Sequence, residues 1–405
     1  MIVVGGGIIG LAVAWRARRQ GLSVTLLERG AIGQGASHVA AGMLAPVSEV
    51  EFGESGRMVL ELGLRSAQMW PAFASELEES SSVAVGLVRT GTMLLAGDED
   101  EARERERQIA FRESLGLALE RLRPSEARAR EPALAPVVRM AAEAKDDHSV
   151  DPRLVLAALA VACRSSGVEL REQAPVAGIE CEGAGGPVTG VSMPGGDRVQ
   201  LAAGGHVVVA AGAWVEQIEG LPAQARMPVR PVKGQIMRLR DPAGPGLLSR
   251  VLRFHGGYIV PRADGSYVLG ATVEERGYEL APSAGGMYEL LRDAHALLPG
   301  VSELQVEELS VGLRPGTPDN LPAIGPGACP GLVWAGGHYR NGILLAPLTA
   351  ELVVDALMGE RPDPLLHACD PARFLGEDRP AAPGTEASPS LETQAQRLAG
   401  RGVLS

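Results

Sequence analysis

The chain has 405 residues, enough for two domains, and its 45% hydrophobic and 21% charged residues are typical of a folded globular protein. A net charge of -11 argues against a nucleic-acid surface, and no run approaches the roughly 18 apolar residues that span a bilayer. Four scattered cysteines without a CxxC pair favour neither a disulfide framework nor a metal site, and the N-terminus lacks signal-peptide features. Together these features predict a cytoplasmic protein.

The first 30 residues predict a βαβ unit. Ile2–Val4 has the composition of a buried strand, Ile8–Gln20 has helical apolar spacing, and Ser23–Leu27 is a second strand-like run that stops at Glu28. The segment from Gly30 to Val47 is rich in Gly, Ala and Ser, and we expect an extended loop there.

Helices and one further strand are predicted in the next part of the chain. Met58–Leu77 has a helical pattern, and the highly charged Glu101–Arg130 is typical of a solvated helix pair on the outside of a domain. Asp151 followed by Pro152 predicts the capped start of another helix. Val207–Ala210 reads as a buried strand that ends in a small-residue turn into a helix.

The pattern then changes to short alternating segments. Met227–Val273 predicts antiparallel strands joined by turns. A last apolar strand is expected at Gly331–Gly337 and a final helix at Pro347–Met358. The composition after about Phe374 predicts a disordered tail over residues 374–405.

The glycine cluster after the first strand carries the strongest local signal. Gly5, Gly7 and Gly10 form a GxGxxG between a strand and a helix, which allows a tight turn and a close approach of backbone to a pyrophosphate. Glu28, at the end of the second strand, can accept hydrogen bonds from ribose hydroxyls. The alternative is a purely structural glycine turn.

The segment after Glu28 favours FAD over NAD. Simple NAD enzymes continue into another βα unit, whereas Gly33–Met43 consists mainly of small residues that let the backbone lie close to a large extended ligand. Ser37 adds a hydroxyl near the expected pyrophosphate. A merely flexible loop is the alternative.

Six motifs in the chain occur together in one family. They are GGGIIG at 5–10, SxxAAGM at 37–43, PVKGQ at 231–235, YIVPR at 258–262, GLRPGTPDN at 312–320 and AGGHYRNGILLAP at 335–347. Over residues 1 to about 370 the chain resembles the FAD-dependent D-amino-acid oxidase (DAO) family, and within it the glycine oxidases of thiamine biosynthesis.

The resemblance implies roles for three catalytic residues. Arg314 matches the arginine that holds the substrate carboxylate, for which a planar guanidinium is suited because it can grip both oxygens. Arg340 matches a second arginine beside the flavin, and Tyr258 matches a tyrosine that orients the substrate. For Arg314 the alternative is a surface salt bridge, and for Tyr258 a packed strand tyrosine.

The resemblance also implies a set of FAD contacts. Ala36 departs from the family, which has a hydroxyl residue there, and His338 is expected to contact the cofactor through its backbone. Lys233 stays open between a cation near the flavin and a strand lysine that faces solvent. The expected contacts are Gly5, Gly7, Ile8, Ile9, Gly10, Glu28, Arg29, Ala36, Ser37, Ala41, Gly42, Met43, Val176, Gly212, His338, Tyr339, Arg340, Asn341, Gly342, Ile343 and Leu344.

The order of these segments predicts an α/β protein with two interleaved domains. We expect a discontinuous Rossmann-type FAD-binding domain over residues 1–80, 145–222 and 322–370. An antiparallel-sheet (α+β) substrate-binding domain is expected over residues 81–144 and 223–321.

The resemblance implies oxidation of glycine, and of sarcosine and small D-amino acids, to an imine that hydrolyses to glyoxylate and ammonia. Oxygen would be reduced to hydrogen peroxide, and the imine would serve the thiazole of thiamine, with thiazole synthase as a possible partner. A homo-oligomer, dimer or tetramer, is expected, with no metal, nucleic acid or membrane. The alternatives are a sarcosine or D-amino-acid dehydrogenase or demethylating oxidase, a flavin-bound non-catalytic subunit, and a nucleotide-sensing module.

Overall fold

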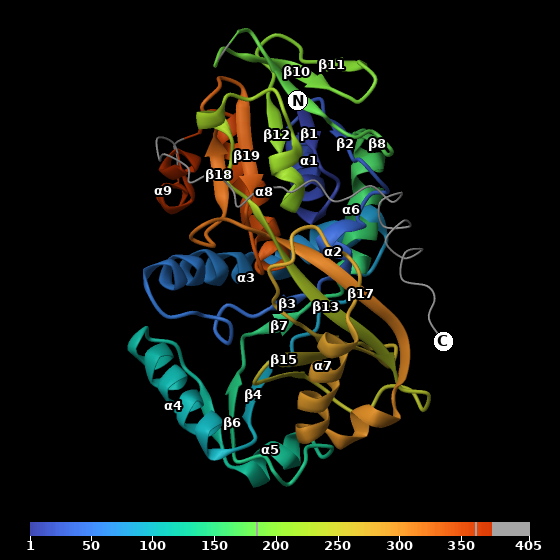
Figure 1. Ribbon diagram of the computed structural model, residues 1–405, viewed down its shortest axis with the longest axis vertical. Coiled ribbons are helices and arrows are strands. Elements are labelled where there is room, and N and C mark those ends of the chain that lie inside the picture. Colours follow the sequence, from blue (N-terminus) through green and yellow to red (C-terminus); the bar gives the residue numbers. More distant parts are fainter. Residues whose placement is uncertain (184, 361–362, 375–405) are drawn as a thin grey trace, which may run out of the picture.

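The computed structural model describes residues 1–183, 185–360 and 363–374, and shows the mixed α/β architecture that the sequence predicts (Figure 1). A six-stranded sheet forms one end of the molecule, with the strand order β18-β19-β12-β1-β2-β8. All neighbours are parallel except β18, which runs antiparallel to β19. The strands are β1 (Ile2–Val4), β2 (Thr25–Leu27), β8 (Glu169–Arg171), β12 (Val207–Val209), β18 (Ala323–Pro326) and β19 (Leu332–Gly336).

Apolar helices cover this sheet and build the largest core. Helices α1 (Ile8–Arg19), α6 (Pro152–Ser166) and α8 (Gly342–Leu357) pack together with the long α3 (Glu54–Ser81). The predicted start of α6 is confirmed, because the Asp151 side chain accepts the Arg153 amide at 2.8 Å and Pro152 occupies the first turn. The predicted βαβ unit is confirmed as β1-α1-β2.

An eight-stranded sheet forms the other end, with the order β17-β13-β16-β15-β14-β4-β6-β5. It is antiparallel apart from the β14–β4 pair, and α7 (Ala284–Leu297) packs against it. The long pair β13 and β17 runs from this sheet toward the six-stranded one (Figure 1). The strands are β4 (Thr92–Ala96), β5 (Glu120–Leu122), β6 (Met140–Ala144), β13 (Arg230–Arg240), β14 (Val251–Phe254), β15 (Gly257–Pro261), β16 (Ser266–Gly270) and β17 (Gln305–Gly316).

The strands of each sheet fall within the ranges expected for one domain, while the domain boundaries themselves stay a prediction. Most of the predicted tail, residues 375–405, lies outside the described residues. Among the described residues, no helix combines the length and apolar character that crossing a membrane requires. Smaller elements are α2 (Gly35–Val39), β3 (Met43–Leu44) with β7 (His148–Ser149), α4 (Glu99–Ser114), α5 (Pro124–Arg130), β9 (Gly178–Cys181), β10 (Val188–Ser192), β11 (Arg198–Gln200), α9 (Leu366–Cys369) and the 3₁₀ helices η1 (Gly212–Gln217), η2 (Ala223–Ala225), η3 (Pro299–Glu303) and η4 (Pro371–Phe374).

Three expectations about local structure are wrong in part. The loop expected over 30–47 contains α2 and β3, because tertiary contacts of this segment with β17 and β7 supply order that its composition does not predict. The predicted helix pair over 101–130 is interrupted by β5, which pairs with β6. The last helix begins at Gly342 and not at Pro347, since packing against α3 outweighs the cost of a proline inside the helix.

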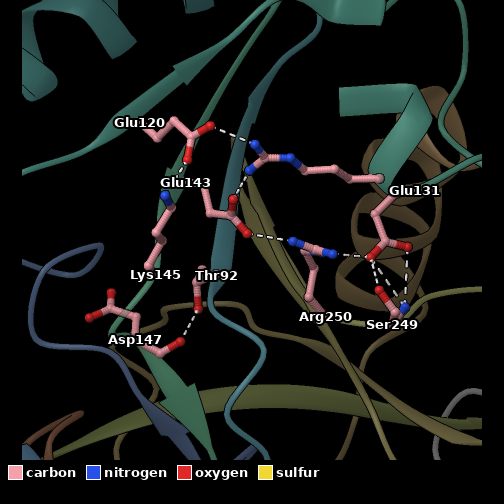
Figure 2. A network of polar contacts seen from close by, with 9 residues as sticks. Thr92, Glu120, Glu131, Glu143, Lys145, Asp147, Ser249 and Arg250 are labelled. Carbon is pink, nitrogen blue, oxygen red and sulfur yellow. Dashed lines mark hydrogen bonds and ion pairs between the residues drawn. The ribbon is translucent and has the colours of Figure 1, made fainter. Parts of the chain in front are cut away.

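A closed network of ion pairs stabilises the eight-stranded end (Figure 2). Glu143 pairs with both Arg130 and Arg250, and Arg250 also pairs with Glu131 at 2.8 Å. Glu131 and Glu143 are only 2% and 5% exposed, so their charges depend on these partners. We call this chain of contacts, which continues through Glu120 to Lys145, the closed network.

Candidate active site

A cavity of about 550 Å³ lies between the two sheets. One end is formed by the β1–α1 turn and the end of β2, and the other end by residues of β13, β15 and β17. The loop that contains α2 and the segment between β19 and α8 line its length. The cavity is thus built by segments that are far apart in the sequence.

The glycines at the β1–α1 turn are required by close packing. An added Cβ at Gly5, which has φ +110°, would lie 2.4 Å from the Ala210 carbonyl oxygen, and one at Gly10 would lie 1.9 Å from the Gly5 oxygen. The start of α1 has no side-chain cap at Gly7, and the Ile8 amide donates to the Ser37 hydroxyl at 3.1 Å. The N-terminus of α1 therefore faces the cavity and favours an anionic group there.

Glu28 is held at the end of β2 by two backbone donors. Its carboxylate accepts the Gly6 amide at 2.6 Å and the Gly30 amide at 2.9 Å. Because a carboxylate offers about four lone-pair sites, it can still accept ribose hydroxyls. Beside it, the Arg29 guanidinium stacks 3.6 Å from the centre of the Trp214 ring, so this end of the cavity has a flat aromatic wall.

Three arginines hold the loop between β2 and β3. Arg153 and Arg238 donate to the His38 carbonyl at 3.2 and 2.9 Å, and Arg262 donates to the Ala41 carbonyl at 2.5 Å. The next residue, Gly42, has φ +80°, and an added Cβ there would lie 2.0 Å from the Val150 oxygen. The backbone along the cavity is thereby held in one position.

These features fit an extended dinucleotide such as FAD. A helix N-terminus is available for the pyrophosphate and a carboxylate for the ribose, and the small residues keep the cavity open between them. At the far end, nothing lies within 4 Å of a Cβ added at Gly336, which leaves room for a flat ring against this segment.

Arg314 is positioned at the end of the cavity that lies away from the glycine turn. Its Nη1 donates to the Thr272 carbonyl at 3.0 Å and to the Lys233 carbonyl at 3.3 Å. Within the described residues these are its hydrogen bonds, so Nε and Nη2 are left for a ligand carboxylate. An added Cβ at Gly234 would lie 2.5 Å from the guanidinium, which explains the glycine of the PVKGQ motif.

Tyr258 lines the same end of the cavity from β15. Burial raises the pKa of Tyr258 to about 12, although the nearby Arg314 acts in the opposite direction. The phenol therefore stays protonated at neutral pH and can donate a hydrogen bond. This arrangement favours a ligand contact over a purely packed strand tyrosine.

Two carboxylates that the sequence did not single out lie beside Arg314 and Arg340. Glu49 lines the cavity and pairs with Arg253, and Glu51 pairs with Arg340. Burial alone would raise the pKa of Glu49, but Arg253, Arg340 and Arg314 outweigh burial and lower it. No motif marks Glu49, because the charge that it meets comes from distant strands.

The structure shows where the side chains of His338 and Lys233 lie. The His338 ring bonds the Thr349 hydroxyl at 2.9 Å, and burial lowers its pKa to about 3, so it is neutral and directed into the protein. Lys233 is 1% exposed and donates to the Ala281 carbonyl at 2.7 Å. Because it does not face solvent, that alternative is wrong, and because it is not among the residues that line the cavity, its role as a cation near the flavin stays a prediction.

The cavity brings together most of the expected site residues. Gly10, Asn341 and Leu344 do not line it: Gly10 packs under the glycine turn, Asn341 caps α8 and Leu344 packs against α3. Trp214 and Glu49 are lining residues that the sequence reasoning missed. The only signal for Trp214 was its place after a small-residue turn. The expected residues that line the cavity are Gly5, Gly7, Ile8, Ile9, Glu28, Arg29, Ala36, Ser37, Ala41, Gly42, Met43, Val176, Gly212, Tyr258, Arg314, His338, Tyr339, Arg340, Gly342 and Ile343.

No group of three or more His, Cys, Asp or Glu side chains is placed to hold a metal ion within residues 1–183, 185–360 and 363–374. Residues 1–356 match the family described as FAD dependent oxidoreductase (DAO). The chain is 37% identical over 361 residues to the glycine oxidase of Geobacillus kaustophilus, covering 87% of this chain and 91% of that one. A crystal structure of glycine oxidase from that organism superposes with a TM-score of 0.83 at 34% identity, covering 93% of this chain and 98% of the other.

A longer relative is the bifunctional protein ThiO/ThiG of Synechocystis sp.. It is 36% identical over 400 residues, which cover 96% of this chain but 57% of the relative. The chain thus spans little more than half the length of this bifunctional protein.

Proposed function

The chain belongs to the FAD-dependent oxidoreductase (DAO) family, and from this premise we propose that it oxidises glycine, and also sarcosine and small D-amino acids, at the carbon–nitrogen bond. FAD is its cofactor. The single observation that carries the proposal is Arg314 at the end of the cofactor cavity with Tyr258 beside it, where two guanidinium nitrogens have no partner in the described part of the chain. A guanidinium and a neutral phenol together suit one carboxylate of a small amino acid.

Positioning is the main task of the residues around the substrate. Arg314 grips both carboxylate oxygens and fixes the plane of the α-carbon, and the Tyr258 hydroxyl donates to the same carboxylate. When bound, FAD supplies the two-electron acceptor for the hydride of the α-carbon. The neutral, inward-directed His338 ring takes no part as a base, so the amine must lose its proton before the hydride leaves.

The product of this step is an imine, which water hydrolyses to glyoxylate and ammonia. We propose that oxygen is the final electron acceptor, with hydrogen peroxide as product. The two-part name of the Synechocystis relative supports a thiazole synthase as partner and a role for the imine in the thiazole of thiamine. The division into two interleaved domains, a homo-oligomer and a cytoplasmic location belong to the same proposal.

The decisive experiment follows the absorbance of the flavin. Under anaerobic conditions, glycine, sarcosine and D-alanine should each bleach the yellow enzyme, and air should restore the colour with release of peroxide. Bleaching without fast reoxidation by oxygen would indicate a dehydrogenase. An enzyme that binds FAD but is bleached by none of the three compounds would overturn the proposal.

A further inference from the structure

A second hollow of about 290 Å³ lies beside the active-site cavity, and the two share Glu49 and Arg340 in their walls. We call it the arginine chamber. Its charged lining leaves an excess of two positive charges. The charged side chains that line it are Arg105, Arg112, Arg253, Arg340, Glu49 and Glu51.

Three of the four arginines are accounted for by the protein itself. Arg253 and Arg340 each have a carboxylate partner, Glu49 and Glu51 respectively. Arg112 is used to hold the loop before α3, because it donates to the Val47 and Ser48 carbonyls, both at 2.8 Å.

Arg105 is the exception, because one of its guanidinium nitrogens has no partner among the described residues, whereas the donors of Arg112 are satisfied by carbonyls. It is 9% exposed, and its Nη1 and Nη2 reach the Gln108 side-chain oxygen at 2.8 Å and the Leu95 carbonyl at 3.2 Å, both neutral acceptors. Its buried Nε has no partner among the described residues. Burial, and then the neighbouring Arg253, lower the pKa of Arg105 to about 10, which leaves it a cation at neutral pH.

The acidic residues on the same helix do not supply a counter-ion in contact with Arg105. Glu101 accepts the Gly97 amide at 2.7 Å, and Glu104 bonds Arg107 and the Gln108 amide. A buried cation with neutral partners is costly unless an anion joins it. The chamber has the volume to admit one.

We propose that the arginine chamber binds a small oxyanion of the carboxylate or phosphate class. The anion lies against Arg105 and Arg253 and competes with Glu51 for Arg340 at the border of the active-site cavity. It can be a free anion, or the second acidic group of an N-substituted glycine whose amino-acid end is held by Arg314. The second possibility, that the anion is part of a substrate, rests on the proposed function.

Iminodiacetate, a glycine that carries a second carboxylate on an N-linked methylene group, is one such compound. Its oxidation would follow the proposed reaction. The α-carbon loses a hydride to the flavin and the nitrogen loses a proton, so that a C=N bond forms. Water then cleaves this bond, and iminodiacetate gives glyoxylate and glycine. Bound FAD would take up the two electrons and oxygen, the proposed final acceptor, would take them over, so no further reagent is needed.

The first test measures binding of inorganic phosphate to the FAD-loaded enzyme by titration calorimetry at low ionic strength, without turnover. Arg105→Gln should weaken binding by about tenfold or more, because a charge-assisted hydrogen bond is lost. Arg107→Gln is the matched control: it changes the same residue type two positions away on the exposed face of α4, and should leave binding unchanged. Glu51→Gln should tighten binding, since it removes the competing carboxylate.

The second test compares kcat/KM for iminodiacetate and glycine. If Arg105→Gln raises KM for iminodiacetate alone, the anion is a substrate group; if only phosphate binding changes, it is a free anion. Arg105→Lys, which keeps the charge, and the flavin absorbance of each variant separate loss of the site from misfolding. Equal phosphate affinity in the wild type and Arg105→Gln, or no binding of either probe, overturns the proposal. Because calorimetry needs no turnover, failure of glycine oxidation would not be confused with failure of the chamber.

Discussion

The closed network and the arginine chamber both bury charge at the eight-stranded end, yet they are balanced differently. In the closed network three cations, Arg130, Arg250 and Lys145, meet three carboxylates, Glu120, Glu131 and Glu143 (Figure 2). In the chamber four arginines meet two carboxylates.

The difference separates two uses of buried arginine. A network in which each charge meets its opposite keeps strands in register and has no capacity for a ligand. A cluster with excess charge, placed next to the cofactor cavity, retains that capacity at some expense of stability. Arg314 belongs to the second kind, because among the described residues its hydrogen bonds go to backbone carbonyls and two of its nitrogens remain free. Substitutions in the closed network should therefore lower the stability of the fold, and substitutions of Arg314 or of the arginines of the chamber should change activity or ligand binding.

The largest effect on activity is expected for Arg314→Leu. It removes the proposed carboxylate clamp, and kcat/KM for glycine should fall by about 10²–10³-fold, as for loss of a desolvated charge pair. The denaturation midpoint should change little, because the hydrogen bonds of this side chain within the described residues go to two backbone carbonyls. Steady-state peroxide assays and urea unfolding of the same preparation measure both. If the variant keeps more than a third of the wild-type activity, Arg314 is not an arginine that binds a ligand.

Glu143→Gln should have the opposite result. It breaks two ion pairs of the closed network and leaves Arg130 and Arg250 partly unpaired, which costs about 3–5 kcal/mol of unfolding free energy. At a temperature where the variant is folded, its KM for glycine should equal that of the wild type. A raised KM in the folded variant would show that the closed network reaches the active site.

Asp147 is a buried carboxylate that belongs neither to the closed network nor to the arginine chamber, and it makes stability depend on pH. It accepts the Val47 and Ser48 amides at 3.0 and 2.6 Å, and burial raises its pKa from 3.8 to about 6. Because the folded state holds this proton more tightly, the contribution is fully present below about pH 4 and is lost as the pH rises through 6. The loss amounts to roughly 3 kcal/mol at about 1.4 kcal/mol per pKa unit.

Urea unfolding at several pH values between 4 and 7 can isolate this contribution by comparing the wild type with Asp147→Asn. The free energy of unfolding of the variant should lack the fall between pH 4 and 7 that Asp147 causes. Its absolute value can be lower at every pH, because one carboxylate oxygen is replaced by an amide nitrogen that cannot accept a hydrogen bond. Identical pH profiles for the two proteins would contradict the assignment.

The smallest effect is expected for Arg253→Gln, which removes the ion-pair partner of Glu49. Burial should then raise the pKa of Glu49, which Arg253 now helps to keep low. The acid limb of the pH profile of kcat/KM should move to higher pH. At pH 8, kcat/KM of the variant should stay within about tenfold of the wild-type value. Arg250→Gln is the matched control from the closed network and should leave the profile in place. If both variants shift the profile equally, the contrast between the two clusters fails.

Much of the cofactor-binding end of the molecule could be predicted, because the sequence patterns that mark it are local. The spacing of Gly5, Gly7 and Gly10 between an apolar strand and helix, with Glu28 after the next strand, follows from what a dinucleotide requires of the nearby backbone. Period-two alternation likewise predicted the antiparallel strands between 227 and 273. The motif around Arg314 could be recognised only as a family pattern; its geometry could not be derived from spacing.

The chain alone thus determined the fold class and the cofactor, because each depends on short-range pattern or motif, whereas the role of Arg314 as carboxylate clamp stays a prediction. Only the tertiary structure decided which charges meet. Glu49 faces Arg253 across about 200 residues, Lys233 is buried against Ala281, and Arg105 has no carboxylate in contact within the part of the chain that the structure describes. These pairings depend on how two interleaved sheets pack, and no local propensity encodes the distance between side chains on different sheets. The glycine turn could be predicted from the sequence; the charges around the Arg314 end of the cavity could not.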